Sequence, residues 1–182
     1  MSGAPAITIS EPGAEPARST AAALADHLLA ATSVTAGLQS WCEARGIGEG
    51  PIRVLSRAGG EPPAGLVALL GAVAGEALSY RRVVLGRGGI ALAEAELLYR
   101  SAALTTEMRE AVARGTTPFG AIVSPLSPRR DTVTCAVGGH DGTLALRLKA
   151  RLVLPCGAAL AAVDEAFLPS LLAPRSALAR GN

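Results

Sequence analysis

The pattern of apolar and polar residues changes its period after the first part of the chain. Before residue 46, apolar residues recur at helical spacing, and Thr20 and Ser33 stand where helix N-caps are favoured. The pattern predicts two helices, over 20–31 and 33–44. Gly46 and the glycines that follow it end the second helix.

From residue 51 onward, apolar and polar residues mostly alternate one by one, which is typical of half-buried strands. The predicted strands cover 51–57, 79–86, 90–100, 132–137, 144–154 and 159–167. The turn Arg87-Gly88-Gly89 predicts a hairpin between the second and third of them.

Three further segments complete the pattern. Residues 105–114 predict a helix with Glu107 and Glu110 near its positive end. Residues 116–126 predict a turn followed by a short strand. Residues 66–78 fit a helix or a strand equally well.

The order of these elements predicts the fold class. Helices come first and hairpins follow, without a regular helix between successive strands, so we expect an α+β protein with an antiparallel sheet of about six strands. A length of 182 residues suits one domain. We expect that domain over 20–174, with a flexible tail over 1–19 and another over 175–182.

Composition excludes several classes of protein. Hydrophobic residues make up 49% and charged residues 18%, which favours a folded core over disorder. The net charge of +2 is too small for a surface that binds nucleic acid. No apolar stretch approaches the ~20 residues that span a bilayer, and residues 1–20 do not resemble a signal peptide. We therefore expect a cytoplasmic protein with neither nucleic acid nor membrane as a partner.

The sequence offers no cofactor or metal motif. GRGG at 86–89 lacks the spacing of a dinucleotide-binding loop, and no phosphate-binding loop, HExxH or GxSxG motif occurs. The three cysteines, Cys42, Cys135 and Cys156, are widely spaced, which favours buried free thiols over a zinc site. We expect no cofactor, no metal and no covalent nucleophile.

Two pairs of adjacent charges stand out within apolar strands. Arg81 and Arg82 point to opposite faces of their strand, and so do Asp164 and Glu165. One member of each pair faces the core, where an ionised group is costly unless it is paired. Each inward charge is either part of a structural ion pair or part of a ligand site, because a guanidinium can hold a carboxylate through two hydrogen bonds.

Ordered motifs along residues 22–172 resemble the chorismate pyruvate-lyase (4-hydroxybenzoate synthase) family. That family shows an arginine that opens a hairpin, a helix that leads to a Pro-(apolar)-Gly turn, a closing strand that ends Glu-x-Phe-Leu-Pro, and an early Ser-(apolar)-Thr. The matching residues here are Arg81, Pro118-Phe119-Gly120, Glu165-Ala166-Phe167-Leu168-Pro169 and Ser33-Val34-Thr35.

The resemblance implies a cofactor-free lyase that converts chorismate to 4-hydroxybenzoate and pyruvate in a buried pocket under helical flaps. Arg81 and Glu165 would be the catalytic residues, the first on the ring carboxylate and the second at the reacting end. Val34, Phe119 and Gly120 would bind the substrate.

One position departs from the family pattern. Glu96 stands where members from the ubiquinone pathway have a second arginine, although members from glycolipid pathways tolerate an acidic residue there. Arg151, Arg100 or Arg147 could supply the second positive charge that chorismate needs.

Three hypotheses follow. The first is a chorismate lyase-like enzyme of secondary or other biosynthetic metabolism. The second is a cyclase of natural-product biosynthesis on the same fold, acting on another substrate. The third is a sensor domain that only binds a small molecule, as in some bacterial transcription regulators. In each case the partner is a small molecule, and the protein is a monomer or homodimer.

Overall fold

The structure is a computed structural model that describes residues 14–138 and 142–173. Most of the expected N-terminal tail and all of the expected C-terminal tail lie outside these residues. The first helix, α1, runs over Ala14–Ala30, so it begins before Thr20 and includes the end of the segment expected to be a tail.

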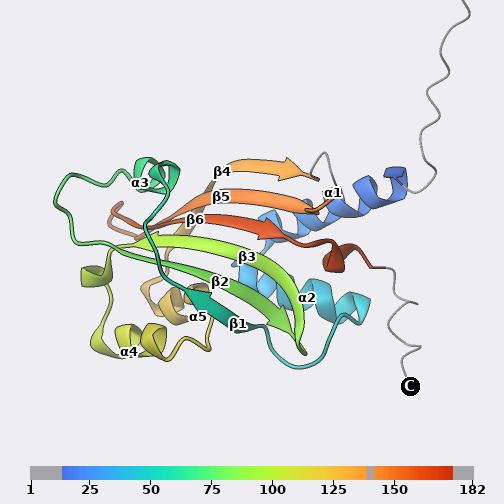
Figure 1. Ribbon diagram of the computed structural model, residues 1–182, viewed down its shortest axis with the longest axis horizontal. Coiled ribbons are helices and arrows are strands. Elements are labelled where there is room, and N and C mark those ends of the chain that lie inside the picture. The colour runs from blue at the N-terminus through green and yellow to red at the C-terminus, as the bar shows by residue number, and fades with distance from the viewer. Residues whose placement is uncertain (1–13, 139–141, 174–182) are drawn as a thin grey trace, which may run out of the picture.

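Six antiparallel strands form one sheet in the order β1-β2-β3-β6-β5-β4 (Figure 1). They are β1 (Arg53–Ala58), β2 (Ser79–Arg87), β3 (Ile90–Tyr99), β4 (Arg129–Val137), β5 (Leu146–Val153) and β6 (Ala159–Phe167). The prediction of an α+β fold with about six antiparallel strands is therefore confirmed. Gly88 and Gly89 turn β2 into β3 with φ angles of 55° and 82°, the left-handed conformation that tight hairpins require.

The helices divide between the two faces of the sheet. Side chains of α1, α2 (Val34–Arg45), α4 (Thr106–Arg114) and α5 (Phe119–Val123) pack on one face, which we call the inner face. The short α3 (Ala64–Leu70) packs on the outer face against Leu98 and Ala162. Figure 1 shows α1 and α2 toward one end of the sheet and α4 and α5 toward the other.

The predicted strand within 116–126 is wrong, because this segment forms α5 and a following 3-10 turn. Phe119, Ile122 and Val123 are all buried, and their spacing places them on one side of a helix. Pro118 precedes the first helical residue. For residues 66–78 the sequence fitted a helix or a strand equally well. In the structure the first part of this segment belongs to helix α3, which Gly71 ends, and a loop follows.

Cysteine burial differs from the expectation at two positions. Cys42 is buried in the core of the inner face, and burial raises the pKa of its thiol to about 11. Cys135 and Cys156 are exposed, so the prediction that they are buried is wrong.

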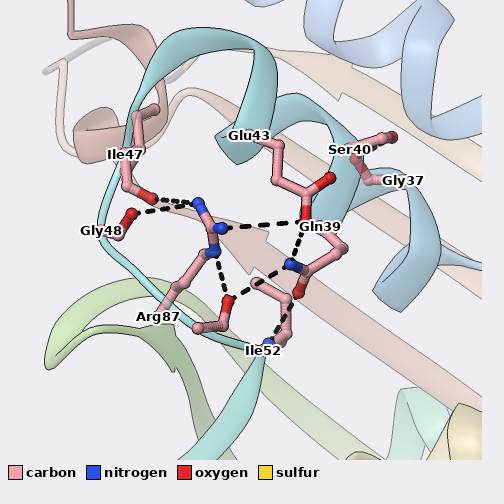
Figure 2. A network of polar contacts seen from close by, with 9 residues as sticks. Gly37, Gln39, Ser40, Glu43, Ile47, Gly48, Ile52 and Arg87 are labelled. Carbon is pink, nitrogen blue, oxygen red and sulfur yellow. Dashed lines mark hydrogen bonds and ion pairs between the residues drawn. The ribbon is translucent and has the colours of Figure 1, made fainter.

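A buried arginine at the end of β2 contacts the end of α2 and the loop that follows it (Figure 2). Arg87, only 8% exposed, donates from Nε to the carbonyl of Gly50 at 2.6 Å and from Nη1 to the carbonyls of Ile47 at 2.9 Å and Gly48 at 3.1 Å. Its Nη2 also lies 3.8 Å from a carboxylate oxygen of Glu43. These contacts satisfy the guanidinium inside the protein and fix the loop after α2.

Candidate functional site

A cavity of about 330 Å³ opens on the inner face of the sheet, beside the N-terminal end of α2 and beside α5. Its walls are mainly apolar. The apolar side chains that line it are Val34, Val83, Leu85, Ala95, Leu97, Pro118, Phe119, Val123, Pro128, Leu152 and Val163. Residues with hydroxyl groups also line it, namely Thr32, Ser33, Thr35, Ser124 and Ser127. A mainly apolar cavity with a few polar groups is the usual form of a small-molecule site.

Arg81 lines this cavity from β2 and is 8% exposed. Its Nη1 makes one long hydrogen bond, 3.5 Å, to the carbonyl of Val112 at the end of α4. Its Nε and Nη2 are buried and have no hydrogen-bond partner among the described residues. Burial lowers the pKa of Arg81, and the nearby charge of Arg57 adds to that effect. The Arg81 side chain is a guanidinium, a group that keeps its positive charge in proteins.

Glu165 lines the same cavity from β6 and is 7% exposed. Its Oε2 accepts a hydrogen bond of 2.5 Å from Nη2 of Arg130, at the start of β4. The pairing crosses β5, where Leu148 lies opposite Glu165 and Leu152 lies opposite Arg130. The inward carboxylate is therefore paired, whereas the inward Arg81 has no carboxylate partner among the described residues.

Strand register explains how residues far apart in sequence meet here. Leu97 lies opposite both Arg81 and Val163, and Ala95 lies opposite Glu165. Arg81 and Glu165 are thus two strands and two residues apart, a separation of about 12 Å between Cα atoms at ordinary strand spacings. Both side chains line the same cavity, but Glu165 contacts Arg130 of β4 and Arg81 contacts the carbonyl of Val112.

Five of the seven site residues predicted from the sequence line the cavity: Arg81, Glu165, Val34, Phe119 and Gly120. Arg82 points to the other face, with a side chain 59% exposed. The ring of Phe119 lies 6.0 Å from the guanidinium carbon of Arg81 and packs against Tyr99 with ring centroids 4.9 Å apart.

The remaining two predicted residues are not at the cavity. Glu96 lies on the outer face, where its Oε1 accepts a hydrogen bond of 2.7 Å from the hydroxyl of Tyr80 and lies 3.5 Å from Arg82. Arg151 is exposed, on a β5 residue that alternates with the buried Leu152. Their placement as cavity residues is therefore wrong, because each is one residue out of step with the inner face.

The other two arginines considered for a second positive charge are engaged elsewhere. Arg100 contacts Glu76 at 2.5 Å and the carbonyl of Ala159, and Arg147 binds Asp164. The second cation at the cavity is Arg130, which the sequence analysis missed. The predicted strand began at Thr132, but β4 begins at Arg129, and alternation along 129–130 would have turned one of these two arginines inward.

Asp164 is the centre of an ion-pair network on the outer face. It accepts hydrogen bonds of 2.7 Å and 2.9 Å from Arg147, and Lys149 lies 3.2 Å away. Burial opposes ionisation of this carboxyl, but the hydrogen bonds and charges of Arg147 and Lys149 together outweigh it and hold its pKa below the usual 3.8.

This lowered pKa predicts a specific acid response. A carboxyl with a lower pKa in the folded state stabilises the fold above its unfolded pKa of about 4, and that stability is lost as the pH falls through the folded pKa. Asp164→Asn should therefore flatten the loss of unfolding free energy below about pH 4, measured by denaturant unfolding at a series of pH values. Arg147→Gln should flatten it as well, and a slope equal to that of the wild type in both variants would contradict this assignment.

The described part of the chain contains neither a cluster of metal ligands nor a membrane-spanning helix. Within residues 14–138 and 142–173, no three His, Cys, Asp or Glu side chains gather as metal ligands. None of the helices in those residues is both long and apolar enough to cross a bilayer.

Comparison with known proteins gives matches in structure alone. No protein-family model matches the sequence, and no curated protein matches it. PhnF from Mycobacterium smegmatis matches with a TM-score of 0.50 and 12% identity, over 71% of this chain and 62% of that one. The present chain thus spans less than two thirds of the PhnF chain.

Two separate domains match as well. The effector domain of PhnF matches with a TM-score of 0.47 and 11% identity, over 71% of this chain and 86% of that one. A ligand-binding domain assigned to a GntR-family transcriptional regulator from Bordetella bronchiseptica matches with a TM-score of 0.45 and 17% identity, over 66% of this chain and 83% of that one.

These comparisons correct the expected family and activity. The ligand-binding domain from Bordetella bronchiseptica is assigned to a transcriptional regulator, the PhnF domain is named an effector domain, and none of these three structures is named a chorismate lyase. The assignment to the chorismate pyruvate-lyase family, the lyase reaction, its enzyme class and a biosynthetic role are therefore withdrawn, together with the cyclase alternative. The physical reason is that the quoted motifs lie at a hairpin, a helix start and a closing strand of the fold, and a shared fold does not determine the chemistry of its site. What the chain shares with these structures is the fold.

Proposed function

We propose that this domain is a small-molecule sensor that binds an anionic organic ligand in the cavity of the inner face. The observation that carries the proposal is Arg81, a buried cation on the cavity wall whose Nε and Nη2 have no partner among the described residues. A buried, unsatisfied charge is costly, so its retention needs a reason beyond stability.

The unpartnered atoms suit a carboxylate or another oxyanion. Nε and Nη2 form one edge of the planar guanidinium, and this edge can donate two parallel hydrogen bonds to the two oxygens of one carboxylate. The N-terminal end of α2 also borders the cavity, and the partial positive charge of a helix N-terminus favours an anion. The apolar walls suit the body of the ligand.

Ligand binding at Arg81 could also be transmitted to the helices α4 and α5. The same guanidinium donates to the carbonyl of Val112 in the last turn of α4, and it packs near Phe119 of α5. A ligand on the free edge of Arg81 would fix the orientation of the guanidinium and so bear on both helices. The chain would then serve as a ligand-binding or effector domain, which is the role that the names of the two domains above give to those proteins.

A series of probes tests this proposal. Acetate, isovalerate and cyclohexanecarboxylate carry the same anionic group on increasing apolar bodies, and each buried CH₂ should add about 0.8 kcal/mol to binding; benzoate completes the series with an aromatic ring. We expect calorimetric affinity to rise from acetate to cyclohexanecarboxylate, benzamide to bind at least about tenfold more weakly than benzoate, and every probe to be recovered unchanged. Equal binding of benzoate and benzamide, or no binding of any carboxylate to the folded protein, would refute the proposal.

A further inference from the structure

Among the residues that the structure describes, three charged side chains line the cavity: Arg81, Arg130 and Glu165. Arg130 and Glu165 are 2.5 Å apart, with side chains only 18% and 10% exposed, so they neutralise each other. Arg81 has no carboxylate partner among the described residues. The cavity therefore carries one net positive charge, and that charge is located at Arg81.

We propose that the Arg130–Glu165 pair makes the cavity selective for monoanions, by withholding the second cation that a dianion would need. This inference rests on the proposed function and names the ligand class of the same site. It also gives Glu165 a role, which is to set the charge of the pocket by occupying Arg130.

Burial makes a second anionic group in this cavity energetically costly. One anionic group can pair with Arg81 and cancel the net charge of the cavity. A second anionic group would either meet only neutral side chains or have to displace Glu165 from Arg130, and both alternatives leave a desolvated carboxylate without a cation. A monoanion meets neither penalty, so charge discriminates between ligands of similar shape.

From the net charge of the cavity, we expect two variants to differ in their selectivity. Glu165→Gln keeps the size of the side chain, releases Arg130 and raises the net charge of the cavity to +2. The double variant Arg130→Gln/Glu165→Gln returns that charge to +1 and leaves two neutral amide side chains. Monoanion selectivity should be lost in the first variant and restored in the second.

The experiment compares benzoate with two dianions on the same ring, isophthalate and terephthalate, whose second carboxylates point in different directions. We expect wild-type protein to prefer benzoate to both dianions by about tenfold or more. In Glu165→Gln, affinity for at least one dianion should rise by about tenfold relative to benzoate, and the double variant should return to the wild-type preference. Melting temperatures of all three proteins establish that each is folded.

The outcomes separate this inference from the proposed function. If wild-type protein fails to bind benzoate or any other carboxylate of the series, the proposed function fails. If benzoate binds but the preference over the dianions is the same in all three proteins, only the inference about the Arg130–Glu165 pair fails. If Glu165→Gln gains a dianion and the double variant keeps that gain, Arg130 is not the cation involved and the inference is overturned.

Discussion

Arg81→Met is expected to raise the stability of the free protein and to remove ligand binding. Methionine fills much the same space without a charge, so it relieves a buried guanidinium of which only Nη1 has a partner among the described residues. We expect a gain of about 1–2 kcal/mol in the free energy of unfolding, from the penalty of unsatisfied buried groups. The affinity for benzoate should fall by about thirtyfold or more, as when one half of a buried charge pair is truncated.

Arg87→Met is the matched control. Arg87 is as buried as Arg81, at 8% exposed, but its donors reach the carbonyls of Ile47, Gly48 and Gly50 (Figure 2). Its replacement should lower the free energy of unfolding by roughly 3 kcal/mol, because buried carbonyls lose a charged donor. Denaturant unfolding of both variants, with benzoate titrations, checks the contrast. Loss of stability in both variants to the same extent would show that Arg81 is a structural residue.

Phe167→Ala should cause the largest loss of stability. Phe167 has no exposed surface and packs in the core of the inner face with Leu92, Leu146 and Leu171. Removing a buried aromatic ring leaves a cavity and typically costs about 3–5 kcal/mol, a large part of the ~5–15 kcal/mol that stabilises a domain of ordinary size. Because Phe167 lies two residues from Glu165 on the same strand face, benzoate binding should weaken too.

Val73→Ala serves as the control for this variant. Val73 is 70% exposed, so its truncation should change the free energy of unfolding by no more than about 0.5 kcal/mol. Urea unfolding followed by tryptophan fluorescence measures both variants, since Trp41 packs in the same core cluster as Phe167. A loss below about 1 kcal/mol for Phe167→Ala would mean that the end of β6 is not an essential part of the core.

The pattern of apolar and polar residues predicted most helices and strands, because each of these elements depends mainly on residues that are close together in the sequence. Alternation placed β2 and β3 within a residue or two, and it put Arg81 and Arg82 on opposite faces; the family resemblance then selected Arg81 as the inward one. The segment around α5 was misread because Ile122 and Val123 favour strands, whereas their burial together with Phe119 is that of a helix face. Tertiary packing decided between the two.

The candidate site was harder to predict because it depends on contacts between distant residues. The ion pair between Arg130 and Glu165 joins β4 to β6 across 35 residues, and no local pattern indicates it. Glu96 was placed at the site by matching a family position, but strand alternation gives the inner face to Ala95 instead. A shift of one residue in a strand exchanges its two faces, so a motif match without a known register cannot assign a side chain to a pocket.

The central claim is that Arg81 holds the anionic group of a ligand through Nε and Nη2. The most direct measurement is a crystal structure of the protein with benzoate. We expect benzoate in the cavity of the inner face, with its two carboxylate oxygens about 2.7–2.9 Å from Nε and Nη2 of Arg81 and the Arg130–Glu165 pair intact. Benzoate bound with its carboxylate away from Arg81, or bound outside this cavity, would contradict it.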